Sequence, residues 1–205
     1  MNKKRVGILI FPDVEVLDFC GPYEVFSVTR LDAARQDAPF DVLVVAEESA
    51  PLAARGGLRV LPDVTTATCP PLDILVVPGG WGVRAALHRP SLLDWVAAQG
   101  RRVETLTAVC TGSMLLGKVG LLNGRFATTH WASLDWMAAS YPDVNVIRDQ
   151  HVVADGNLVT SAGISAGIDM ALHVVAHTFG AEIARATARH MEYRYPSDNT
   201  RRVDL

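Results

Sequence analysis

Short apolar runs alternate with longer segments of helical spacing along the first half of this chain. The runs are rich in Val, Ile and Leu and are bounded by turn residues, which is typical of buried strands. The helical segments carry apolar residues three and four positions apart. This alternation predicts βαβ units and a largely parallel sheet. The predicted strands are Val6–Phe11, Asp41–Ala46, Arg59–Leu61, Asp73–Pro78 and Val103–Val109, and the predicted helices are Tyr23–Leu31, Ser91–Ala98 and Ser113–Val119.

The second half of the chain is less regular, although Asp155-Gly156-Asn157 is a good hairpin turn between two apolar runs. In the first half, Pro22 suits the first turn of the helix predicted at Tyr23–Leu31, and Ser91 is placed to cap the helix predicted at Ser91–Ala98. Together the elements predict an α/β three-layer sandwich, with one domain over residues 1–205. The further predicted strands are Ala127–Thr129, Val144–Ile147, Gln150–Val153 and Leu158–Ser161, and the further helices are Ala132–Ala139, a long helix that Gly163–Gly167 opens and that runs through His177, and Ala181–Tyr193.

Composition supports a compact fold without a nucleic-acid footprint. The 205 residues are 49% hydrophobic and 20% charged, which is the balance of a globular domain with a substantial core. The net charge is −3 and the pI is about 6.0, so nothing indicates a nucleic-acid partner. Basic residues gather near the end of the chain with acidic residues between them, which is typical of a solvated face and tail. They are Arg185, Arg189, Arg194, Arg201 and Arg202.

The cysteines and the first residues of the chain indicate the cellular compartment. The first apolar run is too short for the core of a signal peptide, and no stretch approaches the length of a membrane span. Cys20, Cys69 and Cys110 are an odd number without a pairing pattern, which favours reduced thiols. We therefore expect a cytoplasmic protein that does not use a membrane as a partner.

Cys110 is the candidate nucleophile. The predicted strand Val103–Val109 ends in this cysteine, and small residues lead directly into a helical segment. A tight strand-to-helix turn of this kind lifts one side chain into a cleft. Exposed N–H groups at a helix N-terminus favour the thiolate, which is the reactive form of cysteine. The alternative is a cysteine that packs as a small buried hydrophobe, as we expect for Cys20 and Cys69.

Asp18 is the candidate acid that partners the thiol. It lies between Leu17 and Phe19 just after the first predicted strand, and such a carboxylate should be partly desolvated and suited to proton transfer. The alternative is an aspartate that caps the helix beginning near Pro22. Glu15 is a competing acid one turn earlier.

Three further positions qualify as substrate contacts. Gly79 and Gly80 follow a buried strand, where their backbone N–H groups can approach a ligand, although a plain tight turn explains them equally well. Thr111 follows the cysteine and has a hydroxyl that can face a substrate. His130 can approach the cleft, although a single histidine is more often packed than functional.

No cofactor or metal is expected. His173 and His177 are four residues apart, but no glutamate completes a metalloprotease pattern with them. The chain has neither a phosphate-binding loop of the P-loop type nor a Gly-x-Gly-x-x-Gly dinucleotide motif.

The motifs together resemble the ThiJ/PfpI superfamily, relatives of class I glutamine amidotransferases, from about Val6 to Tyr193. Within it the pattern is most similar to bacterial isocyanide hydratases and to the ligand-binding domains of certain AraC-type regulators. The motifs that carry the resemblance are Phe11-Pro12-Asp13, Leu17-Asp18-Phe19-Cys20-Gly21-Pro22-Tyr23-Glu24-Val25, Pro78-Gly79-Gly80, Ala108-Val109-Cys110-Thr111-Gly112-Ser113, Ala127-Thr128-Thr129-His130-Trp131 and Ala162-Gly163-Ile164-Ser165-Ala166-Gly167-Ile168-Asp169.

The resemblance implies a flavodoxin-like fold, a homodimer, a Cys110 nucleophile, an Asp18 partner and backbone donors at Gly79 and Gly80. Peptidase-like members have histidine where this chain has Thr111, so a Cys-His protease or amidase mechanism is disfavoured. Glyoxalase-like members have glutamate where this chain has Asp18. The regulators need a DNA-reading extension, and we expect none after Leu205.

The sequence thus predicts a cofactor-free cysteine enzyme that hydrates isocyanides to N-substituted formamides through a thioimidate at Cys110. Two alternatives stay open: a ligand-sensing domain without catalysis, and another activity of the superfamily, such as glyoxalase, amidase or protease.

Overall fold

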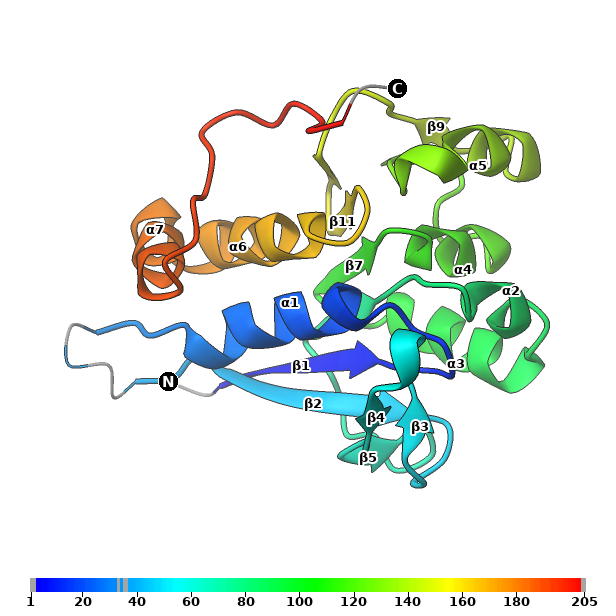
Figure 1. Ribbon diagram of the computed structural model, residues 1–205, viewed down its shortest axis with the longest axis horizontal. Helices are drawn as coiled ribbons and strands as arrows, with labels where there is room; N and C mark the ends of the chain where they lie inside the picture. Colours follow the sequence, from blue (N-terminus) through cyan, green and yellow to red (C-terminus); the bar gives the residue numbers. More distant parts are fainter. Residues whose placement is uncertain (1–2, 33, 35–36, 204–205) are drawn as a thin grey trace.

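A seven-stranded sheet forms the centre of the computed structural model, which describes residues 3–32, 34 and 37–203 (Figure 1). The strand order is β10-β11-β7-β6-β1-β2-β5, and every pair is parallel except β10 with β11. The predicted, largely parallel sheet is confirmed. Its strands are β1 (Lys4–Leu9), β2 (Phe40–Ala46), β5 (Val64–Thr65), β6 (Ile74–Val77), β7 (Thr105–Val109), β10 (Val152–Asp155) and β11 (Leu158–Ser161).

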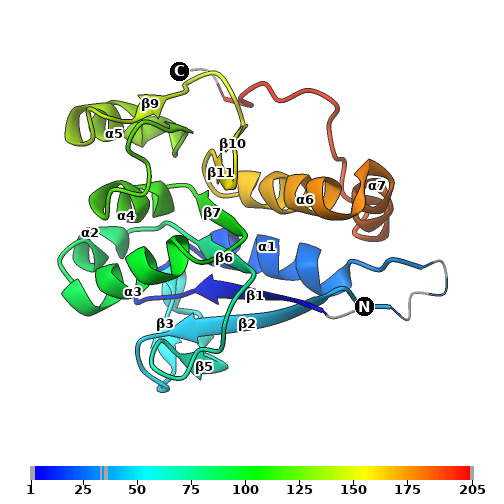
Figure 2. The same ribbon diagram turned by 180° about the vertical axis from the view of Figure 1, so that it is seen from behind.

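Helices cover both faces of the sheet, which confirms the three-layer sandwich. Helices α1, α6 and α7 pack together on one face, and α2, α3 and α4 lie on the other (Figures 1 and 2). The helices are α1 (Val16–Val28), α2 (Val83–Ala86), α3 (Pro90–Gly100), α4 (Gly112–Lys118), α5 (Leu134–Ser140), α6 (Ala166–Phe179) and α7 (Ala181–His190). None of the described helices is long and apolar enough to cross a membrane.

Smaller elements lie outside the main sheet. β3 (Leu52–Ala53) and β4 (Arg59–Val60) form an antiparallel pair around a short 3-10 helix, η1 (Arg55–Gly57). The strand predicted at Arg59–Leu61 therefore belongs to this hairpin and not to the sheet. β8 (Phe126–Ala127) pairs in parallel with β9 (Asn145–Val146), and η2 (Trp131–Ser133) precedes α5.

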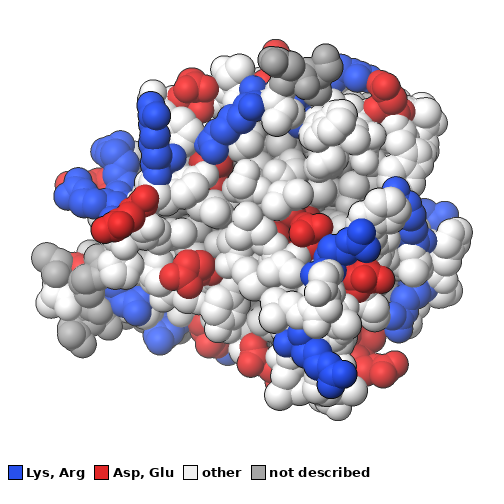
Figure 3. All heavy atoms as spheres, viewed as in Figure 1, with Lys and Arg blue, Asp and Glu red and all other residues white. Residues whose placement is uncertain are grey.

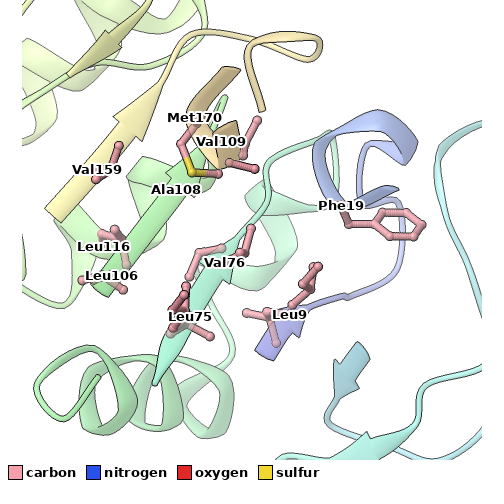
Figure 4. Close-up of a cluster of buried hydrophobic side chains, with 14 of the residues drawn as sticks. Leu9, Phe19, Leu75, Val76, Leu106, Ala108, Val109, Leu116, Val159 and Met170 are labelled. Carbon is pink, nitrogen blue, oxygen red and sulfur yellow. The ribbon is translucent and has the colours of Figure 1, made fainter. Parts of the chain in front are cut away.

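The core is continuous across the middle strands. Leu75 and Val76 of β6 are fully buried, and so are Ala108 and Val109 of β7, because helices cover both faces of these strands (Figure 4). Parallel strands buried on both faces read as unbroken apolar runs, which is why the sequence reveals them. The four adjacent strands β11, β7, β6 and β1 end at one edge of the sheet. Ligands bind at such an edge in open α/β sheets.

Two predicted helix starts are wrong. α1 begins at Val16, so Pro22 lies inside the helix and not in its first turn. A proline there removes one backbone hydrogen bond, at a cost of about 3 kcal/mol. Burial of Phe19, Val25 and Phe26 offsets that cost. The capping alternative for Asp18 is thereby excluded, because Asp18 lies within α1.

Ser91 does not cap α3, since the helix begins at Pro90 and the residue before it makes no side-chain cap. The Ser91 hydroxyl lies 2.6 Å from Glu47 Oε1 and donates to it. In the second half of the chain, α6 begins at Ala166, inside the segment Gly163–Gly167 predicted to open it.

Charged side chains of both signs are interspersed on the face shown in Figure 3. One expectation about charge is wrong, however. Arg201 does not belong to a solvated tail, because only 8% of its surface is exposed.

Candidate active site

Cys110 lies in a tight turn between β7, which ends at Val109, and α4, which begins at Gly112. Its φ of 56° is in the left-handed region, which costs a residue with a side chain about 1 to 2 kcal/mol. The predicted strand-turn-helix geometry is therefore present. Two hydroxyls donate to the Cys110 carbonyl, from Ser113 at 3.1 Å and from Thr129 at 2.9 Å, and hold this backbone in place.

The two neighbouring turns approach each other closely at glycines. A Cβ atom on Gly112 would lie 2.0 Å from the Val77 carbonyl oxygen, and one on Gly79 would lie 2.5 Å from the Thr111 nitrogen. Only glycine fits at these two positions, because real Cβ atoms do not approach backbone atoms so closely. The turn after β6 is thereby pressed against the turn that holds Cys110.

Asp18 reaches the same place from the first turn of α1 and has no solvent exposure. Its Oδ2 accepts a hydrogen bond from the Gly79 N–H at 2.9 Å. Burial raises the pKa of Asp18 from 3.8 to about 8, although the hydrogen bond from the Gly79 N–H lowers it. The Glu15 charge raises this pKa further, and the hydrogen bond with the Cys110 thiol lowers it. The structure thus brings the predicted acid and thiol together.

Burial also raises the pKa of the Cys110 thiol, and the Asp18 charge raises it further. The N–H groups of Thr111 and Ile164 act in the opposite direction, as hydrogen-bond donors to the sulfur. The expected lowering by the helix N-terminus is therefore outweighed by desolvation. Two acids that share a buried site disfavour a second negative charge, so the Cys110 thiol and the Asp18 carboxyl do not readily ionise together. The role of Cys110 as a nucleophile stays a prediction.

A cavity of about 270 Å³ opens over the thiol. Thr111 and His130, both predicted from the sequence, contribute to its wall, and so does Gly80. The residues that line the cavity are Glu15, Gly80, Trp81, Arg84, Cys110, Thr111, His130, Ala132, Ser133 and Ile164. The volume suits a small molecule.

The backbone donors of Gly79 and Gly80 are used inside the protein. Gly79 N–H donates to Asp18, and Gly80 N–H donates to the Thr111 hydroxyl oxygen at 3.0 Å. In this structure the two glycines thus hold Asp18 and Thr111 in position. Direct contact of either glycine with a substrate stays a prediction.

His130 precedes η2, and its Nδ1 accepts a hydrogen bond from the Ala132 N–H at 3.3 Å. Burial lowers the pKa of His130 and the charge of Arg201 lowers it further, against the opposing effect of Glu15. The ring is therefore neutral at neutral pH, which suits a wall residue better than a cation. Its contact with substrate stays a prediction.

Sequence reasoning missed several wall residues. Trp81 is 55% exposed, and the guanidinium groups of Arg84 and Arg55 lie 4.3 Å and 5.2 Å from its ring centre. Ile164 supplies an N–H toward the sulfur and has a φ of 57°. A clue to Ile164 existed in the motif that follows the last strand, where a glycine precedes it. No local signal marks Trp81 and Arg84.

Comparison with known proteins identifies the family of this chain. The model of the DJ-1/PfpI family matches residues 4–177. The chain belongs to the DJ-1/PfpI family. Among curated relatives, an isonitrile hydratase of Pseudomonas putida is 38% identical over 190 residues, which are 92% of this chain and 78% of the hydratase. The transcriptional regulator GbdR of Pseudomonas aeruginosa is 28% identical over 94% of this chain, but the match spans only 51% of the regulator.

Solved structures agree with this assignment. A ThiJ/PfpI family protein from Pseudomonas syringae superposes with a TM-score of 0.84 at 32% identity, over 97% of this chain and 79% of that protein. An AraC family transcriptional regulator from Pseudomonas putida, with a TM-score of 0.75 at 19% identity over 92% of this chain and 99% of that one, shares the fold. Within the described residues, no group of three His, Cys, Asp or Glu side chains is placed to hold a metal ion.

Proposed function

We propose that this protein hydrates isocyanides to N-substituted formamides, with Cys110 as the nucleophile and no cofactor. The observation that carries the proposal is the Cys110–Asp18 pair, buried together beneath a cavity of about 270 Å³. The 38% identity to an isonitrile hydratase supports the same reaction. Thr111 after the cysteine, in place of a histidine base, favours chemistry in which a carboxyl group moves the protons.

In the first step the Cys110 sulfur attacks the terminal carbon of R–N≡C and forms a C–S bond. The thiol proton passes through Asp18 to that same carbon, which gives the thioimidate R–N=CH–S–Cys110. An Asp18 pKa near 8 makes this carboxyl able both to take the proton and to return it close to neutral pH. The Thr111 and Ile164 N–H groups stabilise the sulfur anion as it forms.

In the second step water adds to the thioimidate carbon, with Asp18 accepting a proton from the water. Asp18 passes that proton to the imine nitrogen. The C–S bond of the resulting R–NH–CH(OH)–S–Cys110 then breaks as the hydroxyl proton passes through Asp18 to the sulfur and the C=O bond forms. This releases R–NH–CHO and restores the thiol. The sum is one isocyanide plus one water, so the reaction needs no oxidant or reductant. The cavity wall formed by Trp81 and His130 would hold the R group.

Incubation of the pure protein with an alkyl isocyanide, followed by NMR detection of the formamide, tests the proposal. We expect turnover that Cys110→Ala abolishes and Asp18→Asn lowers at least about a hundredfold. Cys69→Ala is the matched control, since Cys69 is a half-buried thiol that does not line the cavity. Absence of formamide, or turnover that survives Cys110→Ala, would refute the proposal.

A ligand-sensing domain is the second candidate, because transcriptional regulators match most of this chain. The chain spans about half the length of GbdR, so a sensing role would need a DNA-reading region elsewhere. Sensing predicts that calorimetry detects binding of an isocyanide or formamide to both the wild type and Cys110→Ser, and that the wild type makes no product. Assembly into a homodimer and location in the cytoplasm also stay proposals. Light scattering of the purified protein tests the assembly.

A further inference from the structure

The C-terminal tail pairs with the segment that leads into β10, the edge strand of the main sheet. Thr200 forms an antiparallel bridge with Gln150, and the Arg201 N–H donates to the Asp149 carbonyl at 2.7 Å. The Asn199 side chain accepts from the Val152 N–H at 2.8 Å and donates to the Val152 carbonyl at 2.6 Å. The tail thus runs from α7 back across the molecule to the segment that precedes β10 (Figure 1). These bonds fix the register in which the tail arrives.

That register places the Arg201 guanidinium in the interior. Its Nε donates to the Arg148 carbonyl at 2.5 Å, and its Nη2 donates to the Thr128 hydroxyl at 2.6 Å and to the Thr129 carbonyl at 3.2 Å. The neighbouring Arg202, in contrast, forms an ion pair: its Nη2 lies 3.0 Å from Asp169 Oδ2. Arg201 therefore serves as a fork of hydrogen-bond donors.

The segment that Arg201 grips forms the back of the Cys110 site. The Thr129 hydroxyl donates to the Cys110 carbonyl at 2.9 Å, and the Thr128 N–H donates to the Thr160 hydroxyl at 2.9 Å. His130 follows directly and lines the cavity. Two hydrogen bonds that share Thr129 thus connect Arg201 to the strained Cys110 backbone. Arg201 itself does not line the cavity.

We propose that Arg201 is a positioning residue for Cys110: the tail clamps residues 128–130 from behind, and this clamp fixes the Cys110 backbone and the His130 wall. The part of the chain that the family model matches ends at residue 177, so the clamp lies beyond it. Arginine suits this task because its planar fork reaches acceptors on two segments at once, whereas lysine is a single point donor. One guanidinium nitrogen, Nη1, is buried without a hydrogen-bond partner, which costs free energy of folding. A buried group of this kind calls for an explanation, and a functional role supplies one.

The test compares Arg201→Ala and Arg201→Lys with Arg202→Ala, the matched control that removes the neighbouring tail arginine. The first measurement is the rate at which iodoacetamide alkylates Cys110, followed peptide by peptide with mass spectrometry. It does not depend on the proposed hydratase activity. The second is kcat and KM for an alkyl isocyanide, which rests on that proposed function. Near-UV circular dichroism and a melting curve establish that each variant is folded.

For folded Arg201→Ala we expect alkylation of Cys110 to rise at least about tenfold, because the loosened wall exposes a thiol that is now 5% exposed. We expect kcat to fall by a similar factor while KM changes less. Added guanidinium ion should partly restore both the slow alkylation and the kcat of the wild type. Arg201→Lys should lie between Arg201→Ala and the wild type, and Arg202→Ala should alkylate at the wild-type rate.

Wild-type or slower alkylation in folded Arg201→Ala would overturn the proposal. So would equal acceleration in Arg202→Ala, which would indicate loosening of the whole tail. Loss of near-UV circular dichroism in both Arg201 variants would also overturn it, because Arg201 would then be required for folding of the whole protein. If no variant and no wild-type protein makes formamide, the hydratase function fails, while the alkylation rates still decide the role of Arg201.

Discussion

Replacement of Asp18 by asparagine should stabilise the protein, and increasingly so as the pH rises. The substitution keeps the shape of the side chain and an oxygen that accepts from the Gly79 N–H, but it removes the buried charge. Folding raises the pKa of Asp18 from 3.8 to about 8, mainly through burial. The unfolded chain therefore releases this proton at lower pH than the folded protein, and ionisation of Asp18 opposes folding.

The size of this effect follows from the shift. Below about pH 3.8 the carboxyl is neutral in both states and costs nothing, and the cost accumulates as the pH rises toward 8. A shift of roughly four pKa units corresponds to a ceiling of about 6 kcal/mol. Local relaxation and water entry reduce such penalties in real proteins. We expect Asp18→Asn to gain at least about 2 kcal/mol relative to the wild type between about pH 4.5 and about pH 8.

Urea unfolding of both proteins across this pH range measures the difference in free energy of unfolding, and all other titrating groups cancel. Asp155→Asn is a control of opposite sign. The Phe126 N–H lowers the pKa of Asp155, and Arg125 lowers it too, so its stabilising contribution exists above about pH 4 and is lost as the pH falls. A difference between wild type and Asp18→Asn that stays flat with pH would refute the assignment of a buried, charge-averse carboxyl to this site.

Three further outcomes are expected. Gly79→Ala should reduce isocyanide turnover at least about a hundredfold, because its Cβ would lie 2.5 Å from the Thr111 nitrogen; turnover near the wild-type level would show that the turn adapts. Thr111→Val removes the oxygen that accepts from the Gly80 N–H and should cost about 1 to 3 kcal/mol in urea unfolding, whereas Thr111→Ser should recover most of it. Phe26→Ala should cost about 3 to 5 kcal/mol of stability without changing KM, since Phe26 is 1% exposed and does not line the cavity; a loss under about 1 kcal/mol would contradict its place in the core.

The sequence predicted those parts of the molecule that depend on local pattern. β11 matches its predicted range, Leu158–Ser161, because a hairpin turn fixes one end and four buried residues continue from it. The turn that carries Cys110 was predictable for a similar reason, since a buried strand, a cysteine and small residues occur in immediate succession. Strand ends elsewhere differ from prediction by a few residues, where pairing and not composition decides the boundary.

What depends on tertiary contact was not predictable. The start of α1 could not be read from the pattern, because a proline inside a helix is tolerated only when packing compensates for it. Desolvation decides the pKa of Cys110, and burial of that thiol depends on segments remote in sequence. Arg201 looked like one of several tail arginines, since only the pairing of residues 199–201 with residues 149–152 turns it inward.

The segments that follow four neighbouring strands meet around Cys110, and each contributes a residue of the candidate site from a distant stretch of chain. Neither half of the polypeptide holds all residues of the candidate site, so formamide turnover would require that the long-range contacts have formed. During refolding, helical signal should recover before catalysis does, because non-local pairing is the slower event. Proteolytic cleavage just before Arg201 should lower formamide turnover, as expected for Arg201→Ala, and should leave the sheet intact.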